Sequence, residues 1–168
     1  MNPNWTRLEE LLITSSETAI RRFVASLKNR RLLAIGYVFE LGNNSPQFDL
    51  CANVSGDRDF IHDFDYEDRW NSGDYEYPAG LIDTKSELGT EWDSENRQLH
   101  TLANDPDRYA AIYAGIVEIA CRSLIELATR DVLPYPLAID YNVSEVGDDL
   151  SLVASRHKLI LNAIQNRK

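Results

Sequence analysis

The segment from Asp105 to Arg130 constrains the fold more than any other part of this sequence. Asp105 is a good helix N-cap and Pro106 suits the first helical position, which predicts a long helix starting there. The apolar residues of this helix cover a broad face: Tyr109, Ile112, Tyr113, Ile116, Val117, Ile119, Ala120, Leu124, Leu127 and Ala128. A face of this breadth is typical of a helix that packs against a sheet.

Two neighbouring segments have the composition of strands. Residues 32–41 (LLAIGYVFEL) are almost all apolar or aromatic, which predicts a buried strand. Turn-forming residues fill positions 42–46, and Phe48, Leu50, Ala52 and Val54 alternate in the next segment. The short connection predicts a hairpin of residues 32–41 and 47–54, in which Cys51 points away from the face of Leu50.

The remaining patterns complete an α+β chain. Residues 4–30 have helical spacing, read either as one long helix or as two helices broken at residues 14–16. Residues 137–143 predict a strand, residues 150–154 either a second short strand or the start of the last helix, and residues 155–168 a helix. Residues 57–104 are not assigned. We expect one domain over 1–168, with a mainly antiparallel sheet packed by an N-terminal, a central and a C-terminal helix.

The overall charge argues against two classes of partner. The 168 residues include 27 acidic and 17 basic side chains, for a net charge of -10. A surface of this charge repels nucleic acid and anionic lipid, so we expect neither as a partner. No apolar run approaches the ~20 residues of a membrane span, and no signal peptide is visible at the start. Two cysteines make no disulfide framework, so a cytoplasmic protein is expected.

The acidic excess lies in one segment. Residues 57–95 hold 13 acidic and three basic residues, so the rest of the chain is neutral. The same segment is rich in aromatic residues, and acids mixed with aromatic rings suit a surface that binds a basic protein. The predicted partner-binding residues are Asp63, Asp65, Glu67, Asp68, Trp70, Asp74, Tyr75, Glu76 and Tyr77. For Trp70, packing into the core beside Arg69 is the competing interpretation.

Patterns for catalysis and for cofactors are absent from the sequence. The three histidines have no sequence partners arranged for a triad, and the glycines form no phosphate-binding loop. Residues 57–68 are rich in acids, but EF-hand registers starting at Asp57 or Asp63 lack the required Gly and Glu. We therefore predict no catalytic residue, metal site or cofactor. The alternatives are a small metal-dependent or small-molecule enzyme that uses the Asp/His cluster around His62, and an interaction module that self-associates through its long helix.

One short motif resembles a known family. Residues 66–77 (YEDRWNSGDYEY) join Arg-Trp to acids and a second aromatic residue. This motif, the chain length, the helix after residue 105 and the late strand resemble the bacterial domain-of-unknown-function 4303 family. The resemblance implies an immunity protein, which binds and blocks a cognate toxin domain without chemistry of its own. A basic toxin such as a nuclease would suit an acidic inhibitor. The resemblance implies no catalytic residues.

Overall fold

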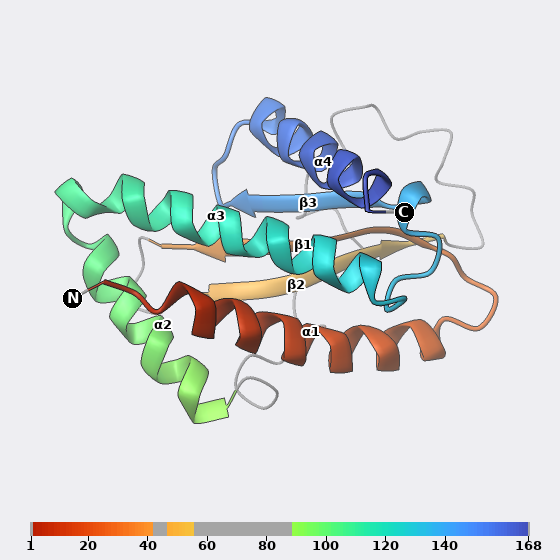
Figure 1. Cartoon of the computed structure of the whole chain (residues 1–168), viewed down its shortest axis with the longest axis horizontal. Coiled ribbons are helices and arrows are strands. Elements are labelled where there is room, and N and C mark those ends of the chain that lie inside the picture. The colour runs from red at the N-terminus through yellow and green to blue at the C-terminus, as the bar shows by residue number, and fades with distance from the viewer. Residues whose placement is uncertain (1, 42–46, 56–88, 168) are drawn as a thin grey trace.

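The computed structural model describes residues 2–41, 47–55 and 89–167 (Figure 1). The described elements, in chain order, are α1 (Trp5–Ser26), β1 (Leu32–Glu40), β2 (Gln47–Val54), α2 (Gly89–Ala103), α3 (Pro106–Thr129), the 3-10 turn η4 (Pro136–Ala138), β3 (Asp140–Glu145) and α4 (Leu150–Gln165). Among these residues, none of the helices combines the length and apolar character that crossing a membrane requires.

The three described strands form a mixed sheet in the order β2-β1-β3. β1 and β2 are antiparallel, with Tyr37 opposite Leu50, which confirms the predicted hairpin. β1 and β3 are parallel, with Tyr37 opposite Val143. The α+β class is confirmed, but the sheet is mixed rather than mainly antiparallel. α3 runs back along the sheet between the hairpin and β3, so the chain enters β3 in the direction of β1 (Figure 1).

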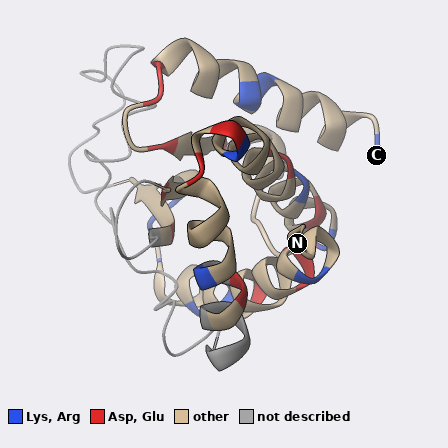
Figure 2. Ribbon diagram, turned by 90° about the vertical axis from the view of Figure 1, so that its left-hand side faces the viewer, with Lys and Arg blue, Asp and Glu red and all other residues tan. Residues whose placement is uncertain are grey.

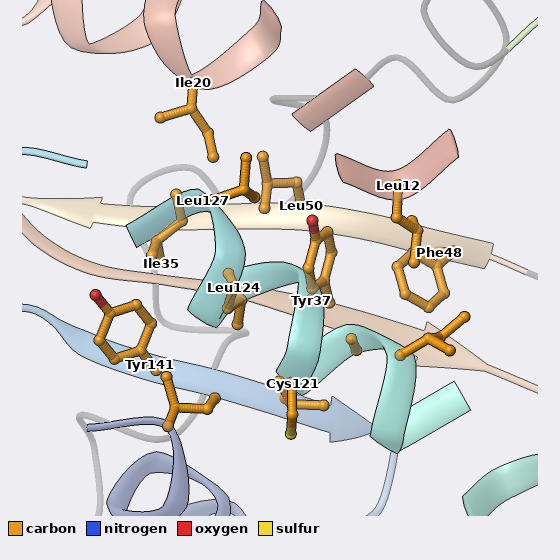
Figure 3. Close-up of a cluster of buried hydrophobic side chains, with 14 of the residues drawn as sticks. Leu12, Ile20, Ile35, Tyr37, Phe48, Leu50, Cys121, Leu124, Leu127 and Tyr141 are labelled. Atoms are coloured by element: carbon orange, nitrogen blue, oxygen red, sulfur yellow. The ribbon is translucent and has the colours of Figure 1, made fainter. Parts of the chain in front are cut away.

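The described helices α1, α3 and α4 pack over one face of the sheet, with α3 between the other two (Figure 1). The strand residues of this face include Ile35, Tyr37 and Leu50, which lie in one core with Leu124 and Leu127 of α3 (Figure 3). Ala34 and Cys51 belong to a separate buried cluster, with Val38 packed against it. Cys51 therefore points to the face opposite Leu50, as the alternation predicts.

α1 is a single unbroken helix. Ser15 donates a hydrogen bond to the carbonyl oxygen of Leu11, 2.7 Å away, and so stays within the helical ladder. The Ser16 hydroxyl faces the core, where it shares a 2.5 Å hydrogen bond with the Tyr37 hydroxyl. The hydroxyl-bearing residues at 14–16 therefore do not interrupt the helix; one of them supplies the partner that a buried tyrosine on β1 needs.

α3 begins as its sequence predicts. The Asp105 side chain accepts a hydrogen bond from the backbone N–H of Asp107 at 3.1 Å, and Pro106 occupies the first helical position. Halfway along α3, the Trp5 ring lies against Gly115, because a Cβ at this position would stand 2.4 Å from the ring. Gly115 therefore permits the close approach of the N-terminal tryptophan to α3.

The C-terminal elements differ from expectation in their bounds. β3 starts at Asp140 rather than at residue 137, because Pro136–Ala138 form the 3-10 turn η4. Residues 150–154 form the first turn of α4 rather than a strand, since the Asp149 side chain accepts from the Ser151 N–H at 2.7 Å and caps the helix. α2, at 89–103, is a helix that the pattern analysis does not identify.

Candidate functional site

The partner-binding residues predicted from sequence lie outside the described residues. This holds for all nine of them: Asp63, Asp65, Glu67, Asp68, Trp70, Asp74, Tyr75, Glu76 and Tyr77. The acids around His62, on which the alternative enzyme hypothesis depends, lie outside them as well. Within residues 2–41, 47–55 and 89–167, no group of three side chains is placed to hold a metal ion.

A polar cluster that sequence patterns do not reveal joins α3, β3 and α4. Its centre is an ion pair in which Arg156 Nη1 lies 2.6 Å from Asp148 Oδ2. Both side chains are only 10% exposed, so the pair is largely removed from water. The same Nη1 donates to the carbonyl oxygen of Val143 at 2.6 Å, which ties α4 to β3. The guanidinium group thus meets both a carboxylate and a strand carbonyl.

Two tyrosines of α3 extend this cluster, which we call the tyrosine–carboxylate cluster (Tyr109, Tyr113, Glu145, Asp148 and Arg156). The Tyr113 hydroxyl donates to Asp148 Oδ1 at 2.7 Å and accepts from Arg156 Nη2. The Tyr109 hydroxyl donates to Glu145 Oε2 at 2.5 Å. The two rings stack with centroids 6.3 Å apart, and the Arg156 Cζ lies 5.5 Å from the Tyr113 ring centroid.

The two carboxylates also bind backbone groups at the ends of the strands. Glu145 Oε1 accepts from the N–H of Leu41, just after β1, at 3.2 Å. Asp148 Oδ2 accepts from the N–H of Glu145 at 2.9 Å, which fixes the turn after β3. The cluster therefore lies at the carboxyl ends of the parallel strands β1 and β3, the end of the molecule viewed in Figure 2. Ligands of open α/β sheets commonly bind at this edge.

The electrostatics of the cluster favour its charged and hydrogen-bonded form. Burial disfavours the Asp148 carboxylate, but hydrogen bonds from Tyr113, Arg156 and the Glu145 N–H outweigh it and lower the pKa of Asp148. Burial and the adjacent carboxylates raise the pKa of Tyr113 and of Tyr109. Each hydroxyl and carboxylate of the cluster is therefore engaged with its neighbours, and the arrangement stabilises the junction of four elements rather than presenting an activated acid, base or nucleophile.

The two cysteines are buried and shielded from chemistry. Burial raises the pKa of the Cys51 thiol to about 12, and the pKa of the Cys121 thiol to about 11 despite the nearby Arg156. Cys121 lies on the core face of α3 (Figure 3), and neither thiol is in a disulfide. Because the thiolate is the reactive form of cysteine, these environments do not suit a nucleophile. The prediction that both cysteines behave as small apolar residues agrees with this burial.

Sequence reasoning missed the tyrosine–carboxylate cluster because its members look like parts of other patterns. Tyr109 and Tyr113 count as apolar residues of α3, and Glu145 and Asp148 as turn acids. The usable signal is the i, i+4 spacing of the tyrosines, which places both hydroxyls on one helix face. Their partners follow 36 and 35 residues later and are defined only by the parallel pairing of β1 and β3.

Comparison of the chain with protein-family models, with curated proteins and with solved structures finds no match. The functional argument therefore rests on the residues themselves.

Proposed function

We propose that this chain is a cytoplasmic inhibitory binding protein of the immunity type, which blocks a basic bacterial toxin domain by occluding its active site. The observation that carries the proposal is the distribution of charge: residues 57–95 hold the entire net charge of -10, and the remainder of the chain is neutral. Acids so concentrated raise the rate at which a basic partner is encountered.

The ion pairs of the described residues support this division of roles. Arg122 lies 2.8 Å from Glu9 and 2.7 Å from Glu118, and Arg130 lies 2.9 Å from Glu126. These pairs join α1 and α3 or reinforce α3 itself, and the buried Arg156–Asp148 pair joins α4 to the turn after β3. Their charges are balanced within the scaffold, which leaves the acids of 57–95 as the source of the excess available to a partner.

Aromatic residues in the acidic segment complement the steering acids. Trp70, Tyr75 and Tyr77 are the proposed anchors, because tyrosine and tryptophan contribute large contact areas at the centres of interfaces. In this proposal the carboxylates bring the toxin domain to the surface and pair with its basic residues, and the rings slow its release. The inhibitor itself forms and breaks no covalent bond.

The test compares two variants with the same change in net charge. The first, D63N/D65N/E67Q, neutralises three acids of the proposed surface. The control, E10Q/D107N/D131N, neutralises three exposed acids of the helical scaffold. Each tagged protein is used to capture partners from the native cell at low and at high salt, and any captured protein is then assayed for toxicity with and without co-expression of this chain.

The proposal expects the wild type and the control to capture one basic protein, and the first variant to lose on the order of tenfold in association rate. Binding should weaken as salt rises, because screening reduces long-range attraction. Co-expression should abolish the toxicity of the partner. Capture of no basic protein, equal capture by both variants, or a partner whose toxicity is unaffected would each overturn the proposal.

A further inference from the structure

A cavity of about 280 Å³ opens where the N-terminal residues meet the end of α2 and the start of α3. Figure 1 shows these three parts of the chain together at one end of the molecule. Its walls are mainly apolar and come from Pro3, Trp5, Leu102, Ala111 and Ile112, and its polar residues are Asn2 and Arg108. The volume is close to the lower end of the range of small-molecule pockets.

The walls of this cavity are held by the packing of the core. Ile112 is 5% exposed and belongs to the main hydrophobic core, and Trp5 and Leu102 pack against that core. The Trp5 ring is fixed against α3 by its contact with Gly115. The cavity is therefore a feature of three packed elements, and a ligand would enter it without the cost of ordering its walls.

Arg108 gives the cavity its chemical character. Its Nε lies 3.3 Å from Asp105 Oδ2, in a pair where both side chains are about half exposed. Among the described residues, no protein group accepts a hydrogen bond from its terminal Nη nitrogens. Guanidinium groups pair with carboxylates through two parallel N–H donors, and this geometry remains open on Arg108. Two helices also begin at the cavity, α1 at Trp5 and α3 at Pro106, and helix N-termini favour negative charge.

We propose that this cavity binds a small amphipathic carboxylate, with its apolar body against Trp5, Leu102 and Ile112 and its carboxylate on the Nη groups of Arg108. The Asn2 side chain lines the same cavity and supplies amide donors and an acceptor for a polar head group. This site is separate from the acidic segment that the proposed inhibitory function uses, so each proposal stands or fails without the other.

The probe is 3-phenylpropanoate, compared with 3-phenylpropanol and 3-phenylpropylamine as neutral and cationic analogues of the same shape. Binding to the full chain is followed by changes in the backbone amide NMR signals of residues 102–112 and in tryptophan fluorescence. We expect millimolar or tighter binding of the carboxylate, about tenfold weaker binding of the alcohol, and no binding of the amine, because an Arg–carboxylate hydrogen bond is charge-assisted.

Three variants separate the contributions of charge and of cavity space. R108Q should reduce carboxylate binding to the level of the alcohol and leave alcohol binding unchanged. A111L, at an exposed position of α3, should fill the cavity and abolish binding of both compounds. R21Q removes an arginine that is 53% exposed and paired with Glu17 on α1, and should change nothing. Thermal unfolding confirms that each variant is folded.

The outcomes decide the proposal in either direction. Tighter binding of the carboxylate that is lost in R108Q and in A111L supports the site. No carboxylate binding at 10 mM, equal binding of carboxylate and alcohol, or binding that A111L leaves intact would overturn it.

Discussion

The imidazole Nδ1 of His157 on α4 accepts a hydrogen bond from the backbone N–H of Tyr141 on β3, at 3.0 Å. One turn away in the same helix-to-strand contact, Arg156 donates to the carbonyl oxygen of Val143. Tyr141 and Val143 face the core with their side chains, so α4 satisfies the backbone groups that β3 does not use in pairing with β1. An edge strand otherwise leaves such groups unpaired.

Replacing His157 should expose the cost of an unpaired backbone donor. H157L should lower the free energy of unfolding by about 1–3 kcal/mol, because the Tyr141 N–H loses its acceptor in a partly buried place. In H157N the amide oxygen can take the position of Nδ1, and we expect less than half that loss. Urea unfolding at pH 7 measures both variants. Equal losses would show that the hydrogen bond is not the contribution that matters.

Removing the charge of Asp148 should be far more damaging than removing that of an exposed acid. D148N leaves Arg156 without its charged partner in a place where both are 10% exposed, and the expected loss is about 3–5 kcal/mol. The matched control is E118Q, since Glu118 also pairs with an arginine at 2.7 Å but is 66% exposed. Its expected loss is about 0.5 kcal/mol or less. Chemical denaturation compares the two, and similar losses would contradict the buried pair.

The same carboxylate predicts how stability depends on pH. The folded-state pKa of Asp148 is lowered, so its contribution is fully present above the unfolded value of about 3.9 and is lost as pH falls through the folded value. The stability difference between the wild type and D148N should therefore be constant from pH 7 to pH 5 and shrink below pH 4. Urea unfolding at each pH measures it. A difference that persists unchanged to the lowest pH would count against this assignment.

Gly36 should tolerate no side chain, because β1 and β3 approach each other closely there. A Cβ on Gly36 would stand 2.0 Å from the backbone oxygen of Asn142, its partner in the parallel register. We expect G36A to cost about 3 kcal/mol or more, since backbone must move to relieve the overlap. G147A is the control: Gly147 has φ +97 and open space around it, so it should cost about 1 kcal/mol of backbone strain. Thermal unfolding ranks the two variants.

Neither cysteine should react in the native protein. With pKa values of about 12 and about 11 and with both side chains buried, Cys51 and Cys121 are protonated and inaccessible at pH 8. An aromatic disulfide reagent should label two thiols per chain in denaturant and none in the folded state over minutes. Rapid labelling of the native protein would show that one of these regions opens.

Local patterns predicted most of the scaffold because they are sufficient where neighbouring residues decide the structure. The Asp105–Pro106 start of α3 is decided by adjacent groups, and the hairpin of β1 and β2 by a short connection. α2 was not predicted, because residues 89–103 begin with glycine, are rich in charged and polar residues, and have few apolar positions, of which Leu99 is buried. The amphipathic signal of this helix is therefore sparse.

Long-range relationships could not be read from the sequence. The parallel pairing of β1 with β3 depends on how α3 crosses the sheet, and residues 32–40 contain no mark of that direction. The tyrosine–carboxylate cluster follows from this pairing, because Glu145 reaches the Leu41 N–H only when the two strands end side by side. The predicted partner-binding residues, from Asp63 to Tyr77, stay a prediction, since they lie outside the described residues.

The central strand has one partner close in sequence and one that is synthesised almost last. During translation β1 can pair with β2 early, but Ala34 meets Asp140, and Phe39 meets Glu145, only after α3 has formed. Contacts between distant residues slow folding, because the intervening chain must be brought together before they contribute. The nascent protein should therefore hold an incomplete hairpin sheet until its C-terminal residues emerge, and chains truncated before α4 should be targets for chaperones and proteases rather than shorter working proteins.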